Sequence, residues 1–231
     1  MKNIVGGLYA ASEWIMRFSV TNLLWLLVNL PIVFGVVNLL KAEEPSHFIL
    51  FLIPTVVLAP VIFFPATAAL FACARDWLLD QDGGSLVASY LKYFKENFKK
   101  CVLGGSILTV LWVILAADYF YLREQSPILG MVFIVFGLIL YVYTINFFSV
   151  NAHYDLKLRD VMKKAMLITV GSPILLLAVS ISGIILLYAS INGPLFLFIF
   201  FTGALTAFLS FSAFYRLYLN ITIKNQSDSD K

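Results

Sequence analysis

Six long apolar runs dominate this sequence of 231 residues. They are Val20–Leu40, Phe48–Ala74, Val102–Leu122, Pro127–Val150, Ala165–Ser190 and Gly193–Leu219. A helix needs about 20 apolar residues to cross a hydrocarbon core about 30 Å thick. Lipid offers no partner to backbone polar groups, so a long unalternating run crosses as a helix. The sequence therefore predicts an all-α polytopic membrane protein with about six transmembrane helices.

The composition excludes a soluble protein. Apolar residues make up 61% of the chain and charged residues 13%, whereas soluble domains are about 45–50% apolar and about 25% charged. The sequence has no extended basic segment that could form a nucleic-acid-binding face, so no nucleic-acid partner is expected. Its two cysteines and two histidines lack metal-ligand spacing, and we expect no metal or cofactor.

The basic residues predict how the chain is oriented. Fourteen of the sixteen lysines and arginines lie before the first run, at or after the end of the last run, or in the loops 75–101 and 151–164. Only Lys41 and Arg123 lie on the other side. Because positive charge accumulates on the cytoplasmic side, both termini should be cytoplasmic in a multi-pass protein of a bacterial plasma membrane. Residues 1–224 would form one membrane-embedded helical domain, with 3–18 as a short interfacial helix and 225–231 as a disordered tail.

The loop 85–101 carries the clearest pattern outside the runs. Apolar residues recur at helical spacing from Val87 to Cys101, and lysines occupy the opposite side. This predicts a cytoplasmic amphipathic elbow helix on the membrane surface. Such a helix either anchors at anionic headgroups or presents a docking surface to a partner. The partner-binding candidates on it are Lys92, Lys95, Phe98, Lys99 and Lys100.

A similar pattern returns 64 positions later. Residues 95–103 and 159–167 share the order basic, acidic, any residue, apolar, Lys, Lys, any residue, apolar, Leu. This predicts a second elbow helix over 154–165, with Arg159, Lys163 and Lys164 as further partner-binding candidates. Two parallel units of span, elbow and span, roughly 48–122 and 127–190, would follow. The alternative is coincidence together with a shared need for basic residues where a span begins.

Prolines and amides mark the predicted membrane interior. The second run holds Pro54, Pro60 and Pro65, so we expect it to be kinked or broken near 59–64. Asn22 and Asn29 share a face of the first run and should point inward, because exposing an amide to lipid is costly. They could form interhelical hydrogen bonds or line a solute path. The candidates for a pore or polar interior are Asn22, Asn29, Pro60, Pro65, Thr67 and Asn146.

An enzymatic alternative rests on Asp76, Asp80 and Asp82 after the second run. Carboxylates at this spacing can hold Mg²⁺ against a diphosphate, as in intramembrane prenyl transferases. Only one such cluster exists, and Gly83 and Gly84 follow it as in a solvated turn. We therefore expect no enzymatic activity, and a metal-dependent transferase stays as a minor alternative.

Several strings resemble the YesL family of uncharacterised bacterial integral membrane proteins. They are Gly6-Gly7-Leu8-Tyr9, Ser12-Glu13-Trp14-Ile15-Met16-Arg17, Asn22-Leu23-Leu24-Trp25-Leu26-Leu27, Leu30-Pro31, Phe64-Pro65-Ala66-Thr67-Ala68-Ala69-Leu70 and Tyr93-Phe94-Lys95-Glu96-Asn97-Phe98-Lys99. The resemblance covers about the first half of the chain, and the stretch between the first boxes is longer here than in the family.

The resemblance implies a genomic setting among oligosaccharide ABC importers and polysaccharide breakdown. Our leading hypothesis is therefore an accessory or regulatory membrane protein for carbohydrate uptake. It would contact ABC importer permease subunits or a cytoplasmic partner through the two elbows. The alternative is a stand-alone small-solute permease with a path beside a proline-broken second span. The sequence does not specify a substrate or an oligomeric state.

Overall fold

The computed structural model describes residues 2–81 and 84–229, with side chains described over 6–81 and 84–223. All elements in this part of the chain are helices. In chain order they are α1 (Lys2–Val28), α2 (Leu30–Leu40), α3 (Pro45–Leu58), the π-helix η1 (Ala59–Phe63), α4 (Phe64–Leu78), α5 (Leu86–Leu122), α6 (Pro127–His153), α7 (Leu158–Gly171), α8 (Pro173–Asn192), α9 (Leu195–Phe200) and α10 (Thr202–Ser229).

Four helical stretches are long and apolar enough to cross a membrane. They are Pro45–Leu78, Leu86–Leu122, Pro127–His153 and Pro173–Asn192. A fifth is present if α1 and α2, which are bent by 71° relative to each other, count as one broken span. The chain is therefore a multi-pass helical membrane protein with four or five candidate spans among its described residues, where the sequence predicted about six.

The first predicted span contains the bend. Pro31 follows two residues after Asn29, and proline has no amide hydrogen for the carbonyl of Leu27. The helix consequently ends at Val28 and restarts at Leu30. Before the bend, α1 is continuous from Lys2, so the expected interfacial helix over 3–18 is part of the same helix as the first apolar residues.

The second predicted span is not broken. The three prolines are accommodated in one continuous helical stretch from Pro45 to Leu78, with a single π-helical segment at Ala59–Phe63. A π-helical turn bonds to the fifth preceding residue, so the backbone can bypass a missing donor without stopping. The sequence predicted a kink or a break near residues 59–64. The irregularity lies there, as a π-helical turn in a helix that continues.

The elbow helices also differ from expectation. Residues 85–101 do not form a separate surface helix, because α5 continues through them to Leu122. Tyr90 and Cys101 from its apolar side are buried in the protein core rather than in headgroups. The second elbow forms the start of α7, which buries Val161, Ala165 and Thr169 on one face. Because Pro173 begins a new helix after Ser172, the fifth predicted span is divided. The internal repeat stays a prediction.

The last predicted span is divided as well. Residues 195–200 form the short helix α9, and α10 starts at Thr202. Helix α10 continues to Ser229, where a disordered tail was expected from residue 225; residues 230 and 231 lie outside the described part. The absence of Pro and Gly after Gly203 explains why nothing stops the helix at residue 225.

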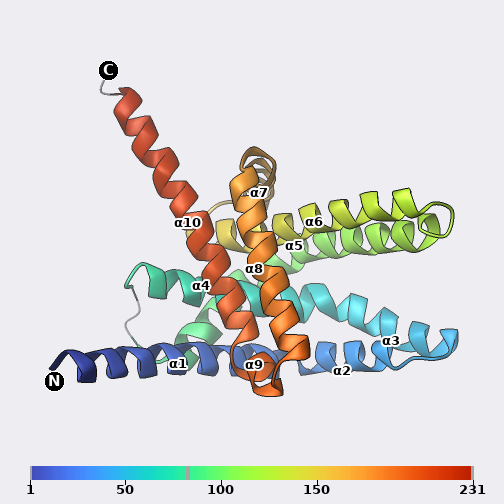
Figure 1. Ribbon diagram of the computed structural model, residues 1–231, viewed down its shortest axis with the longest axis horizontal. Helices are drawn as coiled ribbons and strands as arrows, with labels where there is room; N and C mark the ends of the chain where they lie inside the picture. Colours follow the sequence, from blue (N-terminus) through green and yellow to red (C-terminus); the bar gives the residue numbers. More distant parts are fainter. Residues whose placement is uncertain (1, 82–83, 230–231) are drawn as a thin grey trace.

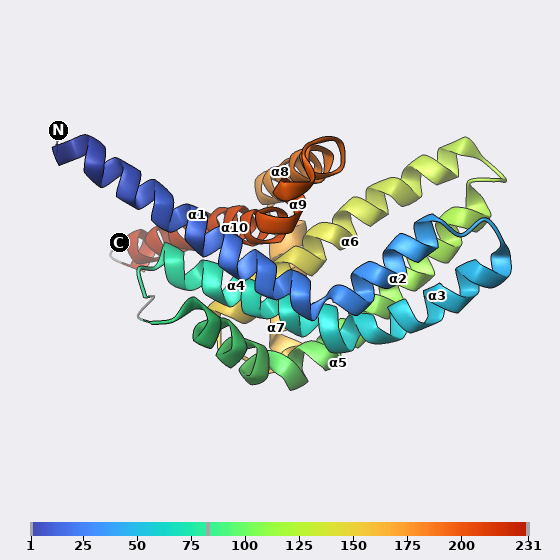
Figure 2. The same ribbon diagram turned by 90° about the horizontal axis from the view of Figure 1, so that it is seen from below.

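The core is centred on α4. Every residue from Phe64 to Ala74 is buried, and the second half of α6 and α10 pack around this segment. Five of these positions are alanine, which lets neighbouring helices approach closely. Figures 1 and 2 show α1 to α6 running along the long axis of the molecule, while α8 crosses them. In Figure 1 the start of α1 and the end of α10 lie at the end opposite the α2–α3 and α5–α6 connections.

Candidate functional site

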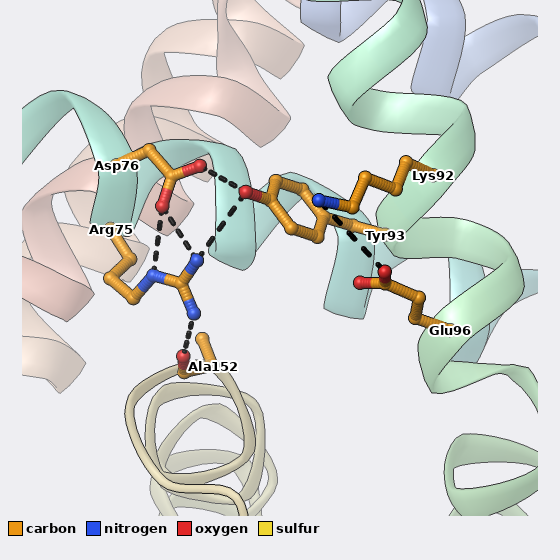
Figure 3. Close-up of polar contacts among 6 residues, drawn as sticks. All are labelled: Arg75, Asp76, Lys92, Tyr93, Glu96 and Ala152. Atoms are coloured by element: carbon orange, nitrogen blue, oxygen red, sulfur yellow. Dashed lines mark hydrogen bonds and ion pairs between the residues drawn. The ribbon is translucent and has the colours of Figure 1, made fainter. Parts of the chain in front are cut away.

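A polar network joins the end of α4 to α5 and α6. The Arg75 guanidinium donates from Nε and Nη2 to Asp76 Oδ1, at 2.9 and 2.6 Å. Its Nη1 donates to the backbone carbonyl of Ala152 in α6, at 2.5 Å. Figure 3 shows the guanidinium lying between the carboxylate and the end of α6. Arg75 therefore neutralises Asp76 and holds α4 to α6.

Tyr93 completes this network from α5. Its hydroxyl donates a hydrogen bond to Asp76 Oδ2, the carboxylate oxygen that Arg75 does not bond, and lies 3.5 Å from Arg75 Nη2 (Figure 3). The Arg75 guanidinium carbon lies 5.4 Å from the centre of the Tyr93 ring, within the range of a cation–π contact. Asp76 is 6% exposed, so its charge is compensated by bonds to two helices. Arg75, Asp76 and Tyr93, called the joint below, connect α4 to α5 and α6.

An open polar pocket of about 570 Å³ adjoins the network. Lys92, Asn97 and Lys100 of α5 line it together with Asn151, His153 and Asp155. Asn151 Nδ2 donates to Asn97 Oδ1 at 2.9 Å, whereas Asn151 Oδ1 is buried without a hydrogen-bond partner among the described residues. Three cations, Arg75, Lys92 and Lys100, and two anions, Glu96 and Asp155, line the pocket. It is therefore suited to a polar partner without a strong preference for one sign of charge.

The predicted lysines of α5 divide into two groups. Lys95 and Lys99 are exposed on the surface of α5. Lys92 Nζ lies 4.0 Å from Glu96, and Lys100 Nζ lies 3.8 Å from Asp155, so both line the polar pocket with a nearby counter-ion. Phe98 is half-buried and contacts Phe94 at a ring distance of 5.8 Å. The structure thus separates two pocket lysines from two surface lysines.

The basic residues of α7 behave similarly. Arg159 and Lys163 are exposed, while Lys164 is half-buried. The Lys164 ammonium lies 3.9 Å from the centre of the Tyr154 ring. Burial, and then the neighbouring Tyr218 phenol, raise the pKa of Tyr154. This tyrosine therefore stays neutral at physiological pH, and its ring makes a cation–π contact with Lys164.

Asn22 is fully buried and hydrogen-bonds the break between α9 and α10. Its Nδ2 donates to the carbonyls of Phe198 and Ile199, at 3.1 and 2.6 Å. Its Oδ1 accepts from the backbone N–H of Ala204 at 3.0 Å. Helix breaks expose backbone groups that need partners. Both ends of the Asn22 amide are consequently used to stabilise the backbone.

The other interior candidates are also buried, except Pro60, which is half-buried. Asn29 Nδ2 donates to the carbonyl of Trp25 at 2.8 Å, and Thr67 Oγ1 accepts from Trp25 Nε1 at 3.1 Å. Asn146 Nδ2 donates to Thr169 Oγ1 at 2.9 Å. Asn29 Oδ1 and Asn146 Oδ1 have no partner among the described residues. Pro60 belongs to η1 and Pro65 to α4. These residues are spread over separate helices and do not form one polar cluster.

The aspartate cluster is divided. Asp76 is bonded to Arg75 and Tyr93, and Asp80 is exposed with a positive φ of 53°. Asp82 lies outside the described residues. In the described part of the chain, no three His, Cys, Asp or Glu side chains are grouped as a metal site.

Sequence reasoning missed Arg75, Tyr93 and Asn151 as a cluster. Arg75 and Asp76 are adjacent in the sequence, and Tyr93 and Asn97 lie one helical turn apart in one of the strings used for the resemblance. Those spacings were visible. The contribution of Asn151 depends on how α6 packs, which no local pattern indicates.

Comparisons with known proteins agree with the resemblance. Residues 18–119 match the family described as a protein of unknown function, DUF624. YteU of Bacillus subtilis (strain 168) is 28% identical over 169 residues, which are 72% of this chain and 65% of YteU. YesL of the same organism is 26% identical over 174 residues, which are 74% of this chain and 70% of YesL. Both relatives are described as uncharacterized.

The alignment thus spans slightly less than two thirds of the length of YteU. A third relative, YesV, is 25% identical over 177 residues, which are 74% of this chain and 72% of YesV. No solved structure matches the chain. The predicted resemblance to the YesL family is confirmed.

Proposed function

Because this chain is a YesL-like helical membrane protein, we propose that it is an accessory or regulatory protein of oligosaccharide ABC-type uptake in the bacterial plasma membrane. Both termini lie in the cytoplasm. Its basic face, defined as Lys95 and Lys99 of α5 with Arg159 and Lys163 of α7, contacts an importer permease subunit or a cytoplasmic partner. The polar pocket beside Lys92 and Lys100 contributes to the same contact.

The Arg75–Asp76–Tyr93 joint is the observation that supports this proposal best. Tyr93 fixes α5 to α4 by its bond to the buried Asp76 carboxylate, and Arg75 fixes α4 to α6 by its bond to the Ala152 carbonyl. The exposed Lys95 and Lys99, two and six residues after Tyr93, therefore lie on a stretch of α5 that is bonded to α4. A rigid, charged helix face is suited to protein recognition, because little ordering is needed when a partner binds.

A stand-alone permease has less support. Both ends of the Asn22 amide bond to the α9–α10 backbone, so neither is free for a solute. The neighbouring cavity of about 340 Å³ is lined mainly by aromatic and aliphatic side chains. A polar solute would lose its hydration there without compensating hydrogen bonds. The second run, expected to open beside the path, is a continuous helix.

Co-purification from native membranes tests the proposed contact. The variant carries Lys92→Glu, Lys95→Glu, Lys99→Glu and Lys100→Glu. A matched control carries Lys41→Glu and Arg123→Glu, which reverse charges at the other end of the molecule. We expect an importer component to co-purify with the wild type and the control. We also expect the fourfold variant to lose that component and to slow oligosaccharide uptake.

Two results would contradict the proposal. One is the absence of any importer component from the wild-type sample together with normal sugar uptake in the fourfold variant. The other is transport of a sugar by the purified protein alone in proteoliposomes, which would favour the permease. Comparable amounts of both variants in the membrane fraction show that the substitutions do not act by degrading the protein.

A further inference from the structure

An apolar cavity of about 340 Å³ lies where α1, α4, α5, α6, α8 and the α9–α10 segment meet. Trp25, Phe71, Trp112 and Phe148 contribute aromatic rings to its wall, and Thr206 of α10 faces it from the other side. Small-molecule sites have volumes of about 300–1,000 Å³. The cavity is therefore large enough for a specific guest.

The threonine hydroxyls and tryptophan N–H groups of the wall are already used in hydrogen bonds. Thr144 Oγ1 accepts from Trp112 Nε1 at 3.2 Å and donates to the carbonyl of Leu140. Thr206 Oγ1 donates to the carbonyl of Thr202 at 2.7 Å. The hydroxyls of Thr202 and Ser190 are 2.5 Å apart. A polar guest would find few free partners, and an apolar cavity of this kind excludes water.

The cavity is open to the outside of the helix bundle. Leu187 of α8 lines it and is 52% exposed. Trp25, Trp112 and Phe198, which also line it, are half-buried. Four of the contributing helices, α4, α5, α6 and α8, belong to candidate spans. In a membrane, the molecules adjacent to this opening are lipid acyl chains.

We infer that the cavity binds one acyl chain of a membrane phospholipid. The gain comes from contact: the wall of an unfilled cavity lacks dispersion partners, and an inserted chain supplies them. This site is independent of the proposed contact at the basic face, because it involves different residues on the membrane side of the molecule.

Lipid retention by the purified protein tests this inference. The full chain is stripped of lipid in detergent, titrated with a two-chain phospholipid and examined by native mass spectrometry. Thr206→Phe places an aromatic ring in the cavity, and the Thr206 hydroxyl that it removes bonds only within its own helix. Ser106→Phe is the control, since Ser106 is exposed on α5 and also bonds within its own helix. We expect the wild type and the control to retain phospholipid and Thr206→Phe to bind it about tenfold more weakly.

Thermal unfolding supplies the second measurement. Added phospholipid should raise the melting temperature of the wild type, because the ligand binds only the folded state, and should raise that of Thr206→Phe much less. If Thr206→Phe fails to fold, Thr206→Met gives the same comparison with a flexible side chain. Equal phospholipid retention by the wild type and Thr206→Phe would overturn the inference. Retention of detergent in place of phospholipid would overturn it as well.

Discussion

The side-chain oxygen of Asn22 accepts a hydrogen bond from the backbone N–H of Ala204, 182 positions later in the chain, at 3.0 Å. The amide nitrogen of the same side chain donates to two carbonyls on the other side of the α9–α10 break. One buried side chain thus supplies both the donor and the acceptor that the interrupted backbone lacks. The break is stable in an apolar setting because α1 provides these partners.

Asn22→Asp should destabilise the protein although it preserves the shape of the side chain. The carboxylate cannot donate to the carbonyls of Phe198 and Ile199, and each unsatisfied buried group costs about 1–3 kcal/mol. Thermal unfolding in detergent measures the loss. Asn38→Asp is the control, because Asn38 bonds only to Phe34 of its own helix. Equal melting temperatures for the two variants would contradict this role of Asn22.

Asp76→Asn should weaken the joint between α4, α5 and α6. It removes the negative charge that faces the Arg75 guanidinium, and hydrogen bonds to charged groups contribute about 1.5–3 kcal/mol. Tyr93→Phe should cost less alone and little more when added to Asp76→Asn, because the two residues share one bond. Asp155→Asn is the control, since Asp155 is fully exposed near Lys100. Full additivity of the two joint substitutions would show that they are not coupled.

Gly105→Ala should be destabilising because α5 approaches α4 closely at this position. A Cβ atom there would lie 2.6 Å from Phe64 Cγ, too near for either helix to keep its place. Overpacking of this kind costs about 1–3 kcal/mol. Gly137→Ala is the matched control, because its Cβ would lie 3.6 Å from Leu115, an ordinary contact. A control that loses as much stability as Gly105→Ala would refute the explanation.

The proposed orientation can be tested with single cysteines. Cys73 and Cys101 are buried, so they give a low background. We expect an impermeant maleimide to label Lys41→Cys in intact cells and to label Lys99→Cys only after permeabilisation. The reason is the distribution of basic residues across the membrane. Labelling of Lys99→Cys in intact cells would reverse the orientation and remove the basis for a cytoplasmic partner.

The apolar runs predicted the helical class and most helix positions, but not the number of spans. Pro31 and the three prolines of the second run looked alike in the sequence, yet Pro31 accompanies a 71° bend. Pro54 lies inside α3, Pro60 in the π-helical turn and Pro65 at the start of α4. A proline removes one donor in each case. Whether the helix stops or changes its hydrogen-bond spacing depends on packing, and the tightly packed α4 keeps its stretch continuous.

The burial of Asn22 and Asn29 was predictable, because an amide in an apolar run has to face the interior. The partners of Asn22 were not, since they lie at a break that the sequence presented as a continuous run. For residues 85–101 the sequence predicted the pattern correctly but not the surface that it covers. Their amphipathic pattern was real, but Tyr90 donates to the carbonyl of Ala66 in α4, so the apolar side covers protein rather than the membrane surface.

Helix α5 has 37 residues, which at 1.5 Å each give a length of about 55 Å. A hydrocarbon core is about 30 Å thick, so nearly half of this helix extends beyond the bilayer. Lys95 and Trp112 lie on the same unbroken rod, about 25 Å apart. A force applied to the lysine end would reach the tryptophan as a tilt or a rotation of the whole rod, with no hinge to absorb it.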